Sequence, residues 1–137
     1  MRRSVLVVDG EPDRRAVAEA LATLDVDVHE AADAVSGLEA ARRLRPAVAV
    51  CEWVIPGGGL GLCRAICEDA DLTGTRVVML TSLADPRDAH TARQAGASAF
   101  LLKPADPDEL RDVVRECLAG RRRFVRQAPM RRAGEPH

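Results

Sequence analysis

Short apolar runs alternate along the chain with segments whose apolar residues recur every three or four positions. The runs cover residues 5–8, 26–28, 47–51, 77–80 and 99–102. Their β-branched character is typical of strands buried on both faces of a sheet. Between the runs, apolar residues fall on one helical face, as they do at Val17, Ala20, Leu21 and Leu24. Five strands alternating with five helices predict an α/β domain with a parallel sheet and right-handed crossovers.

Capping and helix-breaking residues mark the ends of the predicted helices. Asp33 can cap the second helix, and the sequence around Asp106 and Pro107 combines a capping aspartate with a proline in the first turn. Gly96 and Gly120 follow the fourth and fifth helices. The folded domain is therefore expected to span residues 1–120.

The composition agrees with one soluble domain. With 137 residues and 47% apolar side chains, the chain is long enough for one core and too apolar for wholesale disorder. Its apolar runs are far shorter than the roughly 20 residues that a membrane helix needs. The first residues lack the apolar stretch of a signal peptide, so we expect a cytoplasmic protein and no membrane contact.

The four cysteines indicate buried thiols. None forms a CxxC pair, and all four lie in apolar segments. Cys63 and Cys67 have a spacing of i, i+4 that suits a metal, but no histidine is placed to complete such a site. We therefore expect small buried residues in a reducing compartment, with neither a disulfide framework nor a metal.

Charge is distributed unevenly along the chain. The formal net charge is −1, but residues 121–137 contain six arginines and one acid, so the remaining 120 residues carry a net charge of −6. This basic tail is open to three interpretations: a solvated extension, a linker, or a contact to nucleic acid or an acidic partner. The tail lacks the recognition-helix pattern of a DNA-binding domain, which disfavours nucleic acid. Lys103 is the single lysine among 20 basic residues.

Four polar residues follow directly after four of the predicted strands. They are Asp9, Glu52, Thr81 and Lys103. In a doubly wound parallel sheet, sites form beyond the carboxyl ends of the strands, at the point where the strand order reverses. We therefore expect two acids, a hydroxyl and an amine to converge on one rim.

The order and spacing of several short motifs resemble the receiver domain of two-component response regulators. These motifs are Val-Leu-Val-Val-Asp-x-Glu-Pro at 5–12, an acid four residues before Pro56, Leu-Thr-Ser at 80–82, Ala-Gly-Ala at 95–97 and Phe-Leu-Leu-Lys-Pro at 100–104. The resemblance covers about residues 4–119. It implies the chemotaxis-regulator-like fold, a doubly wound five-stranded parallel sheet of order 2-1-3-4-5 with five helices.

The resemblance also implies roles for the rim residues. In the family, two acids after the first strand hold Mg²⁺, and an aspartate after the third strand accepts a phosphoryl group from a histidine kinase. Thr81 matches the hydroxyl and Lys103 the lysine that bind phosphoryl oxygens. Phe100 matches the aromatic switch residue, and the peptide bond before Pro104 is expected to be cis.

Two departures from the family pattern bear directly on this chemistry. Glu52 occupies the phosphoacceptor position, and Gly10 replaces the second metal-binding acid, leaving Asp9 and Glu52 as the acids of the metal site. Glu11 could substitute only if its loop bent. Displacement of the acceptor carboxylate and weakened metal binding both disfavour phosphoryl transfer. We expect at most weak Mg²⁺ binding, no resident cofactor and no enzymatic activity.

The resemblance therefore predicts an atypical receiver that signals through protein contact. Glu52 either pairs with Lys103 and mimics phosphorylation, or belongs to a degenerate pocket without a state preference. A conventional phosphoaccepting receiver and a nucleic-acid binder are the alternatives. The expected partner is a histidine kinase or downstream regulator on the face formed by residues 85–118, and a homodimer remains open. Trp53 is expected to form a half-exposed lid on the pocket.

Overall fold

A computed structural model describes residues 2–82 and 85–121 of the chain. Five strands form one parallel sheet in the order β2-β1-β3-β4-β5. The strands are β1 (Arg3–Val8), β2 (Val26–Ala31), β3 (Val48–Cys51), β4 (Arg76–Thr81) and β5 (Ala99–Leu102). The helices are α1 (Asp13–Leu21), α2 (Ala34–Leu44), α3 (Gly59–Glu68), α4 (Pro86–Gln94) and α5 (Pro107–Leu118), with a short 3-10 helix at Ala70–Leu72.

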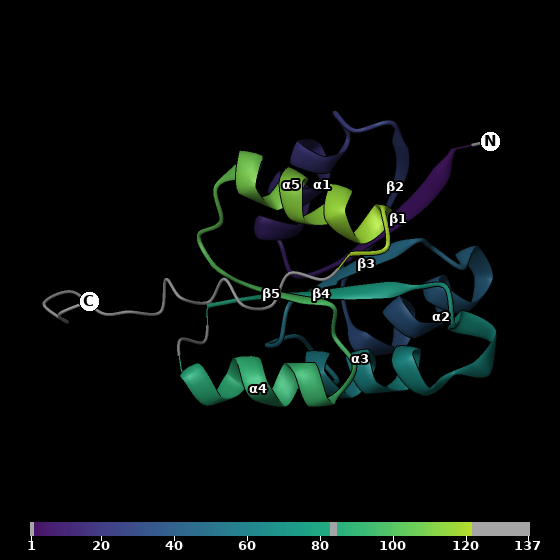
Figure 1. Cartoon of the computed structure of the whole chain (residues 1–137), viewed down its shortest axis with the longest axis vertical. Helices are drawn as coiled ribbons and strands as arrows, with labels where there is room; N and C mark the ends of the chain where they lie inside the picture. Colours follow the sequence, from purple (N-terminus) through teal and green to yellow (C-terminus); the bar gives the residue numbers. More distant parts are fainter. Residues whose placement is uncertain (1, 83–84, 122–137) are drawn as a thin grey trace, which may run out of the picture.

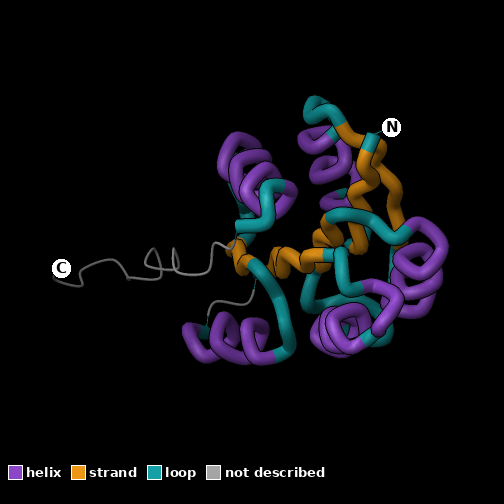
Figure 2. The backbone as a smooth tube through the Cα atoms, turned by 45° about the vertical axis from the view of Figure 1, so that its right-hand side comes forward, coloured by secondary structure: helices purple, strands orange, loops and turns teal. Residues whose placement is uncertain are grey.

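Helices cover both faces of the sheet (Figures 1 and 2). On one face, α1 and α5 pack their buried residues, among them Leu21 and Val113, against alternate side chains of the strands. On the other face, α2, α3 and α4 do the same, with Ile66 and Phe100 at the centre. This arrangement confirms the predicted doubly wound α/β fold and its strand order.

The predicted strands and helices are all present, with shifted boundaries. β2 is three residues longer than its apolar run, because the polar residues His29 and Glu30 pair with β1 although they follow no apolar pattern. The turn at Ala70–Leu72 was not predicted. Of the predicted basic tail, only Arg121 is described, and residues 122–137 lie outside the described residues. No helix of the described ranges is long and apolar enough to span a membrane.

Local interactions set the positions of the helices around the rim. Asp33, Asp85 and Asp106 each accept a hydrogen bond from a backbone N–H in the first turn of the helix that follows, at 2.7–2.9 Å. Gly59 begins α3 so close to the end of β3 that a Cβ there would lie 2.0 Å from the Glu52 carbonyl oxygen. Only a glycine lets α3 approach the site so closely.

Candidate functional site

The predicted rim residues meet at the carboxyl ends of the central strands. Val8 and Cys51 are partners in the parallel register of β1 and β3, so the next residues, Asp9 and Glu52, lie side by side. The Glu52 backbone N–H donates to the Val8 carbonyl at 2.9 Å. Lys103 follows β5, and its backbone N–H donates to the Thr81 carbonyl at 2.8 Å. The sheet register thus brings together side chains that are far apart in the sequence.

The ammonium group of Lys103 is surrounded by three carboxylates. Its Nζ lies 2.7 Å from Asp9 Oδ2, 2.8 Å from Asp13 Oδ2 and 2.9 Å from Glu52 Oε1. The side chains of Asp9 and Glu52 are each only 6% exposed, whereas that of Asp13 is 57% exposed. The ammonium donates hydrogen bonds to Asp9 and Asp13, and the Glu52 oxygen lies within ion-pair distance of the same nitrogen.

Backbone donors hold the two buried carboxylates in addition. The Gly10 N–H donates to Asp9 Oδ1 at 2.7 Å, and the Val54 N–H donates to Glu52 Oε2 at 3.0 Å. Each carboxylate therefore has one oxygen on Lys103 and the other on the backbone of its own loop. Such charge-assisted bonds hold a buried carboxylate in one orientation.

The cluster shifts the ionisation of its members. Burial alone would lower the pKa of Lys103, but the hydrogen bonds to Asp13, Asp9 and Glu52 outweigh it and hold the pKa above its usual value. Burial raises the pKa of Asp9, against the opposing effect of Lys103 and the Gly10 N–H, and the negative charge of Glu52 acts in the same direction as burial. With three carboxylates and one ammonium, the site carries an excess of negative charge.

The space around Gly10, where the family resemblance implies a second metal-binding acid, is open, and Glu11 does not fill it. A Cβ on Gly10 would have no atom within 4 Å. The Glu11 carboxylate instead lies 3.0 Å from the guanidinium of Arg14, which also contacts Glu30 at 3.0 Å. The side chain of Glu11 is 52% exposed and pairs with Arg14, and among the described residues no contact with Lys103 is found for it.

The carboxylates of the site are engaged by Lys103 in this arrangement. The described residues contain no group of three or more His, Cys, Asp and Glu side chains placed to hold a metal. Asp9 and Glu52 each direct one oxygen at Lys103 Nζ and the other at a backbone N–H. Mg²⁺ requires oxygen ligands in near-octahedral geometry, so its binding here would require these oxygens to leave their present partners.

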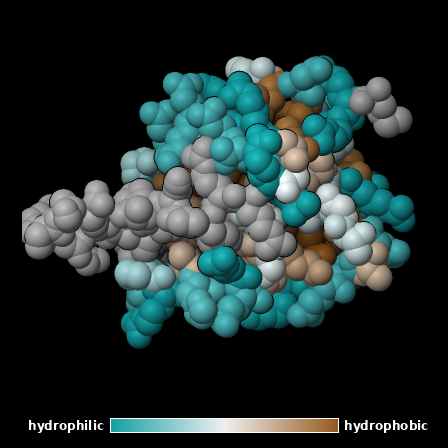
Figure 3. All heavy atoms as spheres, in the orientation of Figure 1, coloured by the Kyte–Doolittle hydropathy of each residue, from teal (hydrophilic) through white to brown (hydrophobic). Residues whose placement is uncertain are grey.

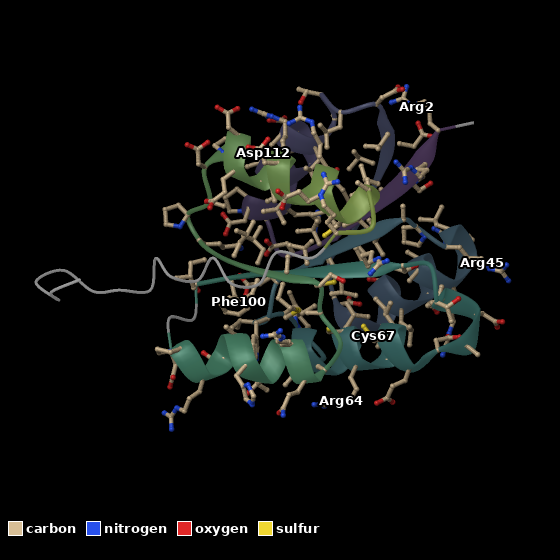
Figure 4. All side chains as sticks on the ribbon, viewed as in Figure 1. Arg2, Arg45, Arg64, Cys67, Phe100 and Asp112 are labelled. Atoms are coloured by element: carbon tan, nitrogen blue, oxygen red, sulfur yellow. The ribbon has the colours of Figure 1, made fainter. Side chains whose placement is uncertain are left out.

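Two aromatic rings connect this site to the core. The edge of the Trp53 ring meets Phe100, with centroids 6.4 Å apart and planes at 88°. Phe100 is fully buried on the side of the sheet that α3 and α4 cover (Figure 4), and Thr81 is fully buried at the end of β4. Trp53 is half-buried, as predicted, and its ring packs against the core cluster on this face of the sheet. Its role as a lid on the pocket stays a prediction.

A groove between α1 and α5 opens beside the cluster. We call it the α1–α5 groove; it has a volume of about 430 Å³ and is lined mainly by Ala16, Val17, Ala20, Leu80, Pro104, Ala105, Pro107 and Leu110. Asp13, Glu52, Ser82 and Lys103 also border it. The peptide bond between Lys103 and Pro104, which turns the chain along its wall, is cis.

Asp13 is the member of the site that the sequence pattern did not single out. It is the first residue of α1 and does not directly follow a strand. The rule that identified the other rim residues considers only the residue after each strand, so it does not select Asp13. The sequence did contain a signal for it. The helix that follows the first strand begins at the same rim, so an acid in its first turn lies near the other rim residues. Cys51, Cys63 and Cys117 are buried as predicted, whereas Cys67 is only partly buried. Burial raises the pKa of Cys51 to about 12.

Comparisons with known proteins agree with this geometry. The model of the response regulator receiver domain matches residues 5–115. The DNA-binding response regulator MtrA of Mycolicibacterium smegmatis is 33% identical over 115 residues, which cover 80% of this chain and 48% of that protein. A two-component response regulator of the LuxR family from Aurantimonas sp. SI85-9A1 superposes with a TM-score of 0.84 at 28% identity, covering 95% of each chain.

A chemotaxis response regulator, CheY4 of Vibrio cholerae, superposes with a TM-score of 0.78 at 25% identity, over 85% of this chain and 99% of that one. The chain therefore spans nearly the full length of these solved structures. It spans about half the length of the curated relatives that it matches.

Proposed function

Because the chain belongs to the response regulator receiver family, we propose that it transmits a two-component signal through protein contact without being phosphorylated at Glu52. In this proposal the charge that other receivers gain by phosphorylation is present permanently. The observation that carries it is the 2.9 Å contact between Glu52 Oε1 and Lys103 Nζ. The family resemblance implies that a phosphoryl oxygen would occupy the same place beside this lysine.

The length of the glutamate side chain supports the proposal. Glu52 reaches Lys103 with one oxygen while its other oxygen accepts the Val54 N–H. An aspartate on the same backbone would be shorter by one methylene, more than about 1 Å, and a shift of that size can cost about 100-fold in a reaction that depends on positioning. The carboxylate is thus suited to a standing ion pair and poorly suited to in-line attack on a phosphodonor.

The loss of the acid at Gly10 supports the same conclusion. Phosphoryl transfer depends on cations that neutralise the charge of the transferred group. The remaining carboxylates face Lys103, and the nearest spare acid, Glu11, is bound to Arg14. The site therefore lacks the arrangement that would concentrate Mg²⁺ beside a phosphodonor.

The signal would reach a partner through the surface of α4, β5 and α5. Lys103 directly follows β5, and the Trp53 ring contacts Phe100 on that strand. A change in the charge of the cluster would therefore act on the position of β5. The outward faces of α4 and α5 are hydrophilic (Figure 3). A polar surface of this kind suits a reversible contact with a histidine kinase or a downstream regulator.

Mass spectrometry of the intact protein tests the proposal. The natural protein and the variant Gly10→Asp/Glu52→Asp are incubated with a small phosphodonor and Mg²⁺. We expect an added mass of about 80 Da, that of one phosphoryl group, in the variant alone. The same adduct on Glu52 of the natural protein would refute the proposal, and the variant shows that the conditions support the reaction.

A binding experiment then separates mimicry from a degenerate pocket. Partner proteins captured by the natural protein are compared with those captured by Glu52→Gln, which keeps the size of the side chain and removes its charge. If Glu52 mimics phosphorylation, the variant loses partners. Identical capture would mean that the charge has no influence on the contact surface. Glu39→Gln, a charge removal on α2 away from the site, serves as the control.

A further inference from the structure

The α1–α5 groove combines an apolar floor with an acidic mouth. Val17, Leu80 and Leu110 are buried side chains that form part of its lining. At the mouth stand Asp13, Glu52 and, behind them, Asp9, with Lys103 as the only described cation of this cluster. The formal charge of the mouth is therefore −2. Such a groove favours an apolar side chain that is accompanied by positive charge.

The two ends of the groove differ. Arg111 on α5 donates to the Ala20 carbonyl oxygen of α1 at 3.2 Å, and Ala20 lies about two helical turns from Asp13. Arg111 thus bridges the two helices away from the mouth. An extended segment that followed α5 would meet the bridged end first and the acidic mouth last.

The chain itself contains a segment of matching chemistry. Residues 122–137 carry five arginines and one acid, a net charge of +4, with the apolar residues Phe124, Val125 and Met130 between them. The described part of the chain, in contrast, is acidic. Because the basic segment and the acidic groove belong to one polypeptide, each is at a high effective concentration relative to the other. Even a weak contact between them is therefore favoured within the chain.

The distance from the end of α5 to the acidic mouth determines which part of this segment can arrive there. α5 ends at the edge of the sheet where the strands begin, beside β1, where Arg3 donates to the Leu118 carbonyl at 2.7 Å. Arg2 and Arg45 lie at this same end (Figure 4). The 12 residues of α5 span about 18 Å, which requires at least about six extended residues. Residues 122–127 are therefore too near to the anchor, and residues 128–132 are the first that can reach the mouth.

We propose that residues 128–132 of this chain dock on the α1–α5 groove, with Met130 in its apolar part and Arg131 and Arg132 at its acidic mouth. The unbranched methionine side chain adapts to an irregular apolar channel. The arginines would supply the positive charge that Lys103 alone does not. This contact would cover the exposed side of α1 next to the cluster. It depends on the charge of the cluster and stands whether or not Glu52 mimics phosphorylation.

Nuclear magnetic resonance of the whole 137-residue chain tests this contact. We compare the natural protein with Arg131→Glu/Arg132→Glu, and we follow the amide signals of Ala16, Ala20 and Ala105. These signals should shift in the variant, and raising the salt concentration should move the natural protein toward the same positions, because salt screens the contact. Met130→Ser should produce part of the same shift at unchanged charge.

The matched control is Arg122→Glu/Arg123→Glu, which changes the net charge equally but lies too close to α5 to reach the mouth. Its groove signals should stay near those of the natural protein. Equal shifts in the two double variants would overturn the proposal, since they would indicate a non-specific charge effect. Unchanged groove signals in Arg131→Glu/Arg132→Glu would also overturn it. Shifts that disappear on dilution would indicate a contact between copies, which contradicts docking within one chain.

Discussion

Replacing Lys103 by methionine should turn the buried cluster into a pH-dependent source of instability. The substitution keeps the length of the side chain and removes its charge. Asp9 and Glu52, each 6% exposed, would then face each other and Asp13 without a counterion. The backbone bonds from Gly10 and Val54 would hold the two buried carboxylates in place, so they could not turn away easily.

The size of the effect follows from the distances. Because all three carboxylate oxygens lie within 2.9 Å of one nitrogen, any two of them are at most about 6 Å apart. At an effective dielectric constant of about 20, two charges about 5 Å apart repel by about 3 kcal/mol. Removing one partner of a buried ion pair costs about 3–5 kcal/mol in general. We expect a loss in this range at neutral pH, a large share of the stability of a domain of this size.

The sign of the pH dependence follows from linkage. In the variant, the pKa of Asp9, already raised by burial, should rise further. A carboxyl with a raised pKa binds more protons in the folded than in the unfolded protein, so stability falls as the pH rises above the unfolded value of about 4. The free energy of unfolding that Lys103→Met loses relative to the natural protein should therefore be small near pH 4 and largest at neutral pH.

Urea unfolding followed by the fluorescence of Trp53, the only tryptophan, measures this deficit at several pH values. Arg87→Met is the control, because it removes a 2.8 Å ion pair with Asp85 whose side chains are 89% and 41% exposed, and exposed pairs contribute little. A deficit in Lys103→Met that is equally large near pH 4 and at neutral pH would show that lost packing, and not charge, is responsible. That result would refute the electrostatic account of the cluster.

Four further outcomes are expected. Millimolar Mg²⁺ should quench Trp53 fluorescence in Gly10→Asp/Glu52→Asp and leave the natural protein unchanged, as a fluorescence titration can determine. Gly59→Ala should destabilise the domain by about 1–3 kcal/mol or more in urea unfolding, because its Cβ would collide with the Glu52 carbonyl, whereas Gly10→Ala should be nearly neutral. Trp53→Leu should lower the melting temperature measured by circular dichroism, with about 1 kcal/mol attributable to the lost edge contact with Phe100. In alkaline titrations the natural protein should begin to lose stability above about pH 9, where unfolded cysteine ionises but buried Cys51 does not, and lose more above about pH 10, where unfolded lysine deprotonates but the raised pKa of Lys103 keeps the folded form charged.

The fold was predictable because its signals are local. Buried parallel strands are continuous apolar runs, and the residue after each run lies at the carboxyl edge of the sheet. That rule alone placed Asp9, Glu52, Thr81 and Lys103 on one rim, and the parallel register then brought them together. The polar half of β2 was missed because an edge strand needs only a pairing partner for its backbone and no apolar pattern.

The details of the site were less predictable because they depend on how helices and side chains rotate. Asp13 faces Lys103 because the buried residues of α1, Val17 and Leu21, fix the rotation of the helix on the sheet. Glu11 turns outward because Arg14 binds it together with Glu30 from the neighbouring strand. Neither outcome follows from spacing within the sequence, since each needs the position of a side chain from another element.

Gly10 and Glu52 belong to one electrostatic arrangement. Three carboxylates already share the single charge of Lys103, so a further acid at position 10 would add a negative charge without a counterion. Because the space at Gly10 is open, Gly10→Asp should cost stability through charge alone, and Gly10→Asn, of similar size, should not. A divalent cation would offset that extra charge, so Mg²⁺ should restore the stability of Gly10→Asp and leave Gly10→Asn unaffected. Equal stability of the two variants, with and without Mg²⁺, would mean that the acid at position 10 and the pairing of Lys103 are independent. In the arrangement seen here, the glycine keeps a fourth carboxylate out of a site whose three carboxylates already exceed the single positive charge of Lys103.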